Sequence, residues 1–200
     1  MVFNQWESSD RPNAAPVLVR TARQQDLNRL ADVLSSSFHI KEGVIGWIYP
    51  LFRMGIYEDL RNRLRTKTDH YVCLVAINQA TPQASSYPLG EENLVGTVEM
   101  GLRTQSFWQP RSHAYLYVSN LAVQREYRRQ GVAQQLLLTC ERVALEWGFQ
   151  ELYLHVLENN FQARRLYRKA GYQIKHAESS LSHWFLGQPR QILMYKHLGE

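Results

Sequence analysis

The segment of residues 121–133 constrains the fold most, because it has the pattern of a strand, a polar turn and a helix in immediate succession. Its sequence is L-A-V-Q-R-E-Y-R-R-Q-G-V-A. At such a turn backbone N–H groups point outward, and the helix N-terminus adds positive potential. Gly131 lets a ligand approach the backbone, and the small Ala133 leaves the first helical turn uncrowded. The pattern predicts a cradle for a pyrophosphate group; an exposed, Arg-rich turn without a ligand is the alternative.

The arginines of this turn, Arg125, Arg128 and Arg129, belong to a basic chain. Its 23 Lys and Arg residues exceed its 18 Asp and Glu residues, which gives a formal net charge of +5. Arg predominates among the basic residues, and it is the better residue for forked contacts with phosphate and carboxylate. The turn matches neither the nucleotide-binding loop G-x-x-x-x-G-K-S/T nor the dinucleotide fingerprint G-x-G-x-x-G. The charge therefore fits an anionic partner of another kind, and a basic surface that serves solubility alone is the alternative.

Several protein classes are excluded by the sequence. No apolar run approaches the roughly 18 residues of a membrane-spanning helix. The polar N-terminus has neither a signal-peptide nor a transit-peptide pattern. Cys73 and Cys140 lie far apart within apolar runs, so we expect two buried thiols in a reducing compartment. The seven histidines show no metal-ligand spacing, and we expect no metal site.

Apolar periodicity predicts a flexible arm over residues 1–16 and one α/β domain over residues 17–200. The predicted strands cover residues 17–20, 71–77, 94–102, 115–123, 151–157, 172–175 and 192–196. A first helix is predicted after Thr21, and a second over Ile40 to Leu64, with an interruption at Pro50. Two more helices are predicted over residues 132–147 and 160–170. This order is typical of one mixed sheet with helices on both faces. Residues 78–93 are expected to form a solvated loop, and Arg61, Arg63 and Arg65 a solvated helix end.

Two blocks of the sequence, in this order, resemble the GNAT superfamily of N-acetyltransferases. The run R-R-Q-G-V-A is similar to the superfamily's acetyl-CoA motif, Q/R-x-x-G-x-G/A. The second block, which resembles the pattern L-x-V, N, A, L-Y and G-F/Y, comprises Leu154-His155-Val156, Asn160, Ala163, Leu166-Tyr167 and Gly171-Tyr172. The resemblance implies a single-domain GNAT fold, with a mixed, mostly antiparallel sheet that is splayed at the fourth and fifth strands. Within the superfamily, the sequence looks closest to ribosomal-protein and protein N-terminal acetyltransferases of the cyanobacterial and plastid type.

The same resemblance implies acetyl-CoA as the co-substrate, with no metal. It implies that backbone groups of residues 121–123 bind the pantetheine arm, and that a bulge parts this strand from residues 151–157. It also implies that residues 128–134 bind the pyrophosphate and that Asn160 contacts the arm near the thioester. The expected co-substrate-binding residues are Leu121, Ala122, Val123, Arg128, Arg129, Gln130, Gly131, Val132, Ala133, Gln134, Asn160 and Tyr167.

Three residues are expected to be catalytic: Tyr167, His155 and Tyr117. Tyr167 matches the tyrosine that protonates the departing thiolate, and a phenol can supply that proton; a core aromatic is the alternative. His155 replaces the Glu of many bacterial relatives and resembles the L-H-V of some eukaryotic N-terminal acetyltransferases, which also have a tyrosine at the position of Tyr117. Because an ordinary histidine has a pKa of ~6.5, it suits a general base near neutrality. The alternative is a structural histidine beside Tyr153.

The acceptor is expected to be a primary amine, foremost the α-amine of a protein N-terminus. An α-amine of pKa ~8 is partly neutral near pH 7, whereas a lysine at ~10.4 is not. Lys side chains are a further class of acceptor, and a small amine (an arylalkylamine, a polyamine or an antibiotic) is the alternative within the fold. A CoA-binding module without catalysis and a nucleic-acid-binding protein are alternatives of other classes, of which the second is weaker.

The surroundings of the amine are predicted to be aromatic and enclosed. The residues expected to form these walls are Phe38, His39, Trp47, Tyr49, Trp184 and Phe185. We expect no membrane partner and no nucleic acid, since the basic excess fits the phosphates of CoA. A monomer and a dimer both remain open. The expected location is the cytoplasm of a bacterium or cyanobacterium, or the plastid stroma.

Overall fold

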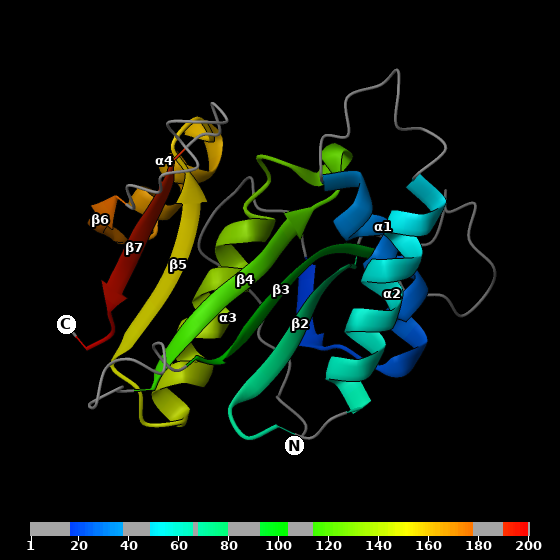
Figure 1. The fold of residues 1–200 in the computed structure, drawn as a ribbon, viewed down its shortest axis with the longest axis horizontal. Helices are drawn as coiled ribbons and strands as arrows, with labels where there is room; N and C mark the ends of the chain where they lie inside the picture. The colour runs from blue at the N-terminus through cyan, green and yellow to red at the C-terminus, as the bar shows by residue number, and fades with distance from the viewer. Residues whose placement is uncertain are drawn as a thin grey trace. The chain divides into compact units, whose positions relative to one another are not determined.

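The computed structural model describes residues 17–37, 49–65, 68–79, 93–103, 114–177 and 190–199, with the backbone alone at 37, over 49–53 and at 177. The strands are β1 (Val17–Thr21), β2 (Tyr71–Asn78), β3 (Leu94–Arg103), β4 (Tyr115–Val123), β5 (Glu151–Leu157), β6 (Gln173–Ala177) and β7 (Gln191–His197). The helices are α1 (Leu27–Ser37), α2 (Tyr49–Arg65), α3 (Val132–Glu146) and α4 (Phe161–Lys169) (Figure 1). Short 3-10 helices, Gln24–Asp26 and Arg125–Tyr127, precede α1 and α3.

The strands form one mixed sheet in the order β1-β2-β3-β4-β5-β7-β6, which confirms the predicted α/β class. The β4–β5 pair is parallel, and the pairs of β1 with β2, β5 with β7 and β6 with β7 are antiparallel. Among the described residues, β4 and β5 pair only at Leu116–Leu152 and Tyr117–Tyr153. Strand β7, in contrast, pairs with β5 along the whole of Glu151–Leu157. Strands β4 and β5 therefore part beyond Tyr117, as the resemblance implies.

The chain forms two compact units, and β3, β4 and α3 contribute residues to both. The first unit comprises residues 1–99 and 120–136. Its helices α1 and α2 pack on each other, because each presents an apolar stripe to the same core. The buried residues of this core are Leu27, Leu30, Val33, Leu34, Leu60, Cys73, Val75, Ile77, Leu94 and Ala122. Cys73 is buried and forms no disulfide, as predicted.

Helix α2 differs from the prediction at its start. It begins at Tyr49, so Pro50 lies in its first turn rather than interrupting it. Proline is tolerated there because the first N–H groups of a helix have no intrahelical partner. At the other end, Arg63 makes an ion pair of 2.9 Å with a buried carboxylate, that of Glu99 on β3. Arg61, Arg63 and Arg65 are all exposed, as expected for a solvated helix end, but the sequence did not indicate the pair of Arg63 with Glu99. Residues 40–48 lie outside the described residues.

Strand β3 has helices on both of its faces within the first unit. The side chain of Glu99 meets α2 through Arg63. Gly96, three positions earlier, lies on the opposite face of the strand. A Cβ atom at Gly96 would lie 3.1 Å from a methyl carbon of Val132 and 3.3 Å from one of Leu136, both on α3. It would also lie 3.1 Å from the carbonyl oxygen of Ala122 on β4. Glycine at this position therefore allows the close approach of α3 to the sheet.

Substitution of Gly96 by alanine is expected to lower the free energy of unfolding by about 2 kcal/mol, because the added methyl group overpacks the β3–α3 contact. Denaturation in urea, with the m-value compared between variants, measures this change. The control is Gly55→Ala in α2, where a Cβ meets nothing within 4 Å. That change should raise the free energy of unfolding by about 0.5–1 kcal/mol, since glycine is a poor helix former. Equal stability of the Gly96→Ala variant and the wild type would contradict the packing.

The second unit comprises residues 100–119 and 137–200. Leu152, Leu154 and Val156 of β5 are buried, and they alternate with Tyr153 and His155, which point to the other face of the strand. Glu141 of α3 and Lys196 of β7 form an ion pair of 2.8 Å. Cys140 of α3 is a buried free thiol, as predicted. The alternation on β5 leaves an aromatic face, which contains the predicted catalytic histidine.

Candidate functional site

The turn between β4 and α3 has the backbone of an anion cradle. Arg129 and Gly131 have left-handed φ angles of 68° and 84°, so the chain reverses sharply before Val132 begins α3. The first N–H groups of a helix have no intrahelical partners and carry the positive end of the helix dipole. Helix α3 has no acidic residue in its first turn that would oppose an anion. Val132 is 1% exposed, so this residue can serve a ligand only through its backbone.

Side-chain hydrogen bonds hold this turn in shape and fix it to β3. Arg128 Nε donates to the carbonyl oxygen of Val123 at 3.1 Å, and Gln130 Nε2 donates to that of Glu126 at 2.8 Å. Gln124 Nε2 donates to the carbonyl oxygen of Leu94 on β3 at 2.9 Å. Arg128 is therefore partly used in holding the loop, while Arg129 is exposed. The turn is held in shape by contacts that leave the N–H groups of residues 132–134 out of the intrahelical ladder.

The strand before this turn is irregular at Asn120, the only non-glycine residue of β4 with a positive φ, 52°. This irregularity lies where the resemblance implies a bulge. Leu121, which follows, is half-buried, and Ala122 and Val123 are buried. These three expected pantetheine-binding residues thus present their backbone rather than long side chains. Ala133 and Gln134 are half-buried in the first turn of α3.

In the second unit, Tyr117 and His155 form a hydrogen-bonded pair. Tyr117 Oη lies 2.9 Å from His155 Nδ1, and the ring centroids are 5.6 Å apart. The strands bring them together because Tyr117 pairs with Tyr153, and His155 is the next residue of β5 on the same face. The guanidinium of Arg103 lies 3.7 Å from the centroid of the Tyr117 ring. His155 is half-buried and lies just past the point where the paired registers of β4 and β5 end.

Helix α4 positions Tyr167 and Asn160. Burial, followed by the neighbouring Tyr117, raises the pKa of Tyr167 to about 12. The phenol is therefore protonated at any physiological pH and can donate a hydrogen bond or a proton. Asn160 is the N-cap of the helix, since its Oδ1 accepts a hydrogen bond of 3.1 Å from the N–H of Ala163. The predicted helix boundary is confirmed, and Asn160 has a structural role beside the ligand contact that the resemblance implies.

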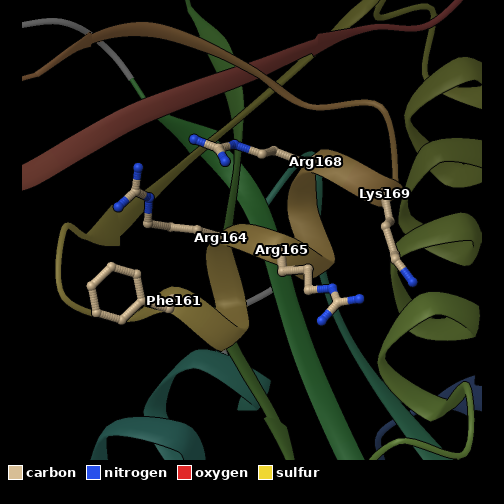
Figure 2. A pocket seen from close by; sticks show the side chains of 5 residues that line it. All are labelled: Phe161, Arg164, Arg165, Arg168 and Lys169. Atoms are coloured by element: carbon tan, nitrogen blue, oxygen red, sulfur yellow. The ribbon is translucent and has the colours of Figure 1, made fainter.

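The outer face of α4 carries a basic hollow that the sequence analysis did not single out. Its volume is about 580 Å³. Figure 2 shows its lining residues, which are Phe161, Arg164, Arg165, Arg168 and Lys169. Phe161 is 72% exposed, with the Arg164 guanidinium 5.9 Å from its ring centroid. The run of basic residues in 164–169 was the available signal, but cations at these spacings also occur on ordinary solvated helices.

Some expected residues lie outside the described part of the chain. They are Phe38, His39, Trp47, Trp184 and Phe185, and Tyr49 has a described backbone only. The arm over residues 1–16 and most of the loop over residues 78–93 are likewise outside it. Among the described residues, no three His, Cys, Asp or Glu side chains are grouped as metal ligands would be. None of the described helices is both long enough and apolar enough to cross a membrane.

Comparison with known sequences identifies relatives of the chain. Residues 48–172 match the family model described as the acetyltransferase (GNAT) family. The chain is 30% identical over 178 residues to "GCN5-related N-acetyltransferase 10, chloroplastic" from Arabidopsis thaliana, which covers 86% of this chain and 68% of that protein. It is 31% identical over 147 residues to thialysine N-epsilon-acetyltransferase from Bos taurus, which covers 66% of this chain and 81% of that protein.

Solved structures share the fold at lower sequence identity. The PaiA N-acetyltransferase of Thermoplasma acidophilum, in complex with coenzyme A, superposes with a TM-score of 0.66 at 19% identity and covers 90% of this chain and 98% of its own. Arabidopsis thaliana NAA60, in complex with a bisubstrate analogue, superposes with a TM-score of 0.63 at 20% identity. The match covers 92% of this chain and 99% of the NAA60 chain. Both likenesses extend over nearly the whole fold.

Proposed function

Because this chain belongs to the acetyltransferase (GNAT) family, we propose that it moves the acetyl group of acetyl-CoA to the free α-amine of a protein N-terminus. Lys side chains are a second class of acceptor in this proposal. The observation that carries it is the hydrogen bond of 2.9 Å between Tyr117 Oη and His155 Nδ1. In this pair His155 is the base, and the acceptor that we propose for it is an amine with a pKa of ~8, the ordinary value of a protein N-terminus.

The pair can orient the base. When His155 Nδ1 carries the proton and donates it to Tyr117 Oη, the other ring nitrogen, Nε2, is left as an acceptor. Nε2 then takes the proton of the attacking amine, directly or through a water molecule. The bond to Tyr117 thus selects the tautomer and holds the ring in place. This role differs from that of a structural strand histidine, which takes no proton from a substrate.

Acetyl-CoA supplies an acetyl group that is activated as a thioester. The amine nitrogen forms the new bond to the acetyl carbon, and the carbon–sulfur bond breaks. We assign to Tyr167 the proton that neutralises the departing thiolate. Its raised pKa of about 12 keeps the phenol in the donor form before transfer and favours its recovery of a proton from water afterwards. The proton lost by the amine ends on His155, so the charges balance.

The cradle before α3 suits the diphosphate of acetyl-CoA. Arg128 and Arg129 supply charge, and the backbone of residues 130–134 supplies N–H donors. The left-handed Gly131 presents no side chain to the ligand. Backbone groups of residues 121–123 and the amide of Asn160 are assigned to the pantetheine arm.

Substitution of Gly131 by alanine should raise the KM for acetyl-CoA by about tenfold, since a Cβ in the left-handed region costs roughly 1–2 kcal/mol and occupies the ligand's approach. The φ of 84° at this position makes the strain unavoidable. The value of kcat should stay within about twofold. Initial rates at varied acetyl-CoA concentration separate the two constants. Gly148→Ala is the matched control, because Gly148 also has a positive φ, 81°, but follows the far end of α3. An unchanged KM in the Gly131 variant would contradict the cradle.

The proposed acceptor can be tested in cells. The chain is expressed in a bacterial host, and protein N-termini and lysines are examined for acetyl groups by mass spectrometry. A strain that expresses the Tyr167→Phe variant at the same level is the control. We expect acetylated N-termini that are specific to the active chain, with a preference for particular second residues. Acetylation confined to lysines would contradict the preference for α-amines, and an unchanged proteome would contradict protein acetylation.

A small amine is the second candidate acceptor. The relative from Bos taurus is named for thialysine, a small lysine analogue, and its match to this chain covers 81% of that relative. Competition between a peptide with a free N-terminus and a small diamine for the same enzyme decides between the two. We expect the peptide to have the higher kcat/KM. A small amine with the higher kcat/KM would replace the proposed function by this candidate.

We assign the protein to a reducing compartment, the bacterial cytoplasm or the plastid stroma. The Arabidopsis relative is named chloroplastic, and Cys73 and Cys140 are both buried free thiols. A fluorescent fusion of the full chain in its own organism tests this assignment. Signal at the cell surface or in a secretory compartment would contradict it.

A further inference from the structure

Glu99 is the most deeply buried carboxylate among the described residues, and the proposed reaction does not use it. It lies on β3 in the first unit and is 1% exposed. Removing a carboxylate from water is costly unless hydrogen bonds and opposite charge replace the lost solvation. Three donors do so here. Arg63 Nη1 and Tyr71 Oη donate to Glu99 Oε2 at 2.9 Å and 2.8 Å, and Asn120 Nδ2 donates to Oε1 at 2.6 Å.

The three donors come from three different elements of the unit. Arg63 is on α2, where it also pairs with Asp59 at 2.6 Å. Tyr71 is the first residue of β2, and burial together with the Glu99 charge raises its pKa, so it remains a donor. Asn120 is on β4. Arg63 and Tyr71 satisfy one carboxylate oxygen and Asn120 the other. A single buried charge thus links α2, β2 and β4.

Asn120 is the donor in an unusual backbone conformation. Its φ of 52° lies in the left-handed region, which is unfavourable for residues with a Cβ atom, although less so for asparagine than for most. The residue stands in the middle of β4, immediately before Leu121. The direction of the backbone over residues 121–123 therefore depends on the conformation of Asn120. The short hydrogen bond to Glu99 ties that conformation to a fixed point in the core.

We propose that Glu99 is a positioning residue for acetyl-CoA: by holding Asn120 in the left-handed conformation, it fixes the backbone of residues 121–123 in the form that binds the pantetheine arm. This inference rests on the proposed function, which assigns that arm to residues 121–123. Glu99 itself, being buried, touches neither substrate. Its influence is transmitted through Asn120, and the hydrogen bonds from Arg63 and Tyr71 hold its carboxylate in place.

The consequence is a specific kinetic signature. Glu99→Gln keeps the size of the side chain but replaces one accepting oxygen by an NH₂ group, which cannot accept from Asn120 or from Arg63 and Tyr71. We expect this variant to bind CoA and acetyl-CoA about tenfold more weakly, with kcat at saturating acetyl-CoA within about twofold. A purely structural carboxylate would lower the melting temperature and leave the affinity of the folded protein unchanged.

Changes at Asn120 separate conformation from mere contact. Both Asn120→Ala and Asn120→Gly remove the hydrogen bond to Glu99, but glycine enters the left-handed region without the Cβ penalty. Affinity for CoA should therefore fall in the order wild type, Asn120→Gly, Asn120→Ala. If the Glu99→Gln chain does not fold, this order still decides the matter, since Asn120 is half-buried and its substitution keeps the hydrogen bonds of Arg63 and Tyr71 to Glu99. Equal affinities in the two Asn120 variants would overturn the conformational role.

The closing experiment is a double-mutant cycle on the full chain. The Kd for CoA is measured by calorimetry for the wild type, Glu99→Gln, Asn120→Ala and the double variant, with melting temperatures alongside. We expect the double variant to bind as weakly as Asn120→Ala alone, because both changes break one link. The inference would be overturned if the losses of CoA affinity in the two single variants multiply in the double variant, or if the Glu99→Gln variant binds CoA like the wild type. Arg61→Gln, which removes an exposed pair with Glu58, is the control and should change nothing.

Failure of this inference differs visibly from failure of the proposed function. If the wild type binds no CoA, the proposed function fails and the inference fails with it. If the wild type binds CoA and acetylates peptides while the Glu99 and Asn120 variants do so equally well, only the inference fails. If CoA binds as expected but no protein N-terminus is a substrate, the Kd cycle still decides the role of Glu99.

Discussion

Replacement of Tyr167 by phenylalanine is expected to lower kcat by about 100-fold, the middle of the range for loss of a general acid. The ring stays in place, because phenylalanine fills the same buried space on α4, where Tyr167 packs at 5.9 Å between ring centroids from Tyr172. Only the proton for the departing thiolate is lost. The KM for acetyl-CoA should therefore change little. Steady-state rates, followed by the free thiol released from acetyl-CoA, give both constants.

Tyr172→Phe is the matched control for this prediction. Tyr172 is also buried, and among the described residues its hydroxyl has no hydrogen-bond partner. Its removal should leave kcat unchanged and should not lower the stability, since it deletes a buried polar group that lacks compensation. A Tyr167→Phe variant with a kcat as high as that of the Tyr172→Phe variant would show that Tyr167 is only a core aromatic.

The raised pKa of Tyr167 also has a consequence for the alkaline range. Its folded-state pKa of about 12 exceeds the ordinary value of 10.0. The stability contributed by the protonated form is therefore complete below pH 10 and is lost as the pH rises toward 12. Activity should likewise show no alkaline loss through Tyr167 below about pH 11. A decline in activity that sets in near pH 9 in the wild type and is absent from the residual activity of the Tyr167→Phe variant would contradict this.

Replacement of His155 by alanine is the second large effect, an expected loss of about 100-fold in kcat/KM for the acceptor. The variant loses the base and leaves Tyr117 without its partner at 2.9 Å. Added imidazole should restore part of the rate to the alanine variant, because a small base can enter the space that the side chain leaves. Rates with a peptide acceptor, with and without imidazole, measure both effects.

His176 provides the control for His155. It is an exposed histidine on β6, and His176→Ala should keep the full rate and show no response to imidazole. Tyr117→Phe should lose less than His155→Ala, about tenfold, since it removes only the group that orients the base. A His155→Ala variant within about threefold of the wild type would leave the histidine with a structural role beside Tyr153.

The elements next to the two sequence blocks were the most predictable part of the fold. Asn160 and Gly171 bracket α4 as predicted, because capping preferences are local in sequence. The turn from Val123 to Val132 also forms as predicted, with a left-handed glycine where a ligand would approach. These features depend on residues within a few positions of one another, so a single sequence contains the information for them.

Long-range features could not be predicted in this way. Glu99 is 36, 28 and 21 residues away from Arg63, Tyr71 and Asn120, so nothing near it in the sequence indicates that it would be buried. For the same reason, the pair of the exposed Arg63 with Glu99 was not predicted. The basic hollow on α4 was missed because an Arg-rich helix face is also typical of ordinary surfaces. The aromatic walls predicted for the amine stay a prediction, since most of those residues lie outside the described part of the chain.

The central claim, acetyl transfer to a protein N-terminus, is tested most directly with two peptides of identical sequence that lack lysine. One has a free α-amine, and the other has a blocked one. The purified chain is given labelled acetyl-CoA and each peptide, and label in the peptide is followed with time. The account predicts that the free peptide alone gains one acetyl group, at a rate that falls about 100-fold in the Tyr167→Phe variant. Absence of label from the free peptide, with turnover of a small amine under the same conditions, would contradict it.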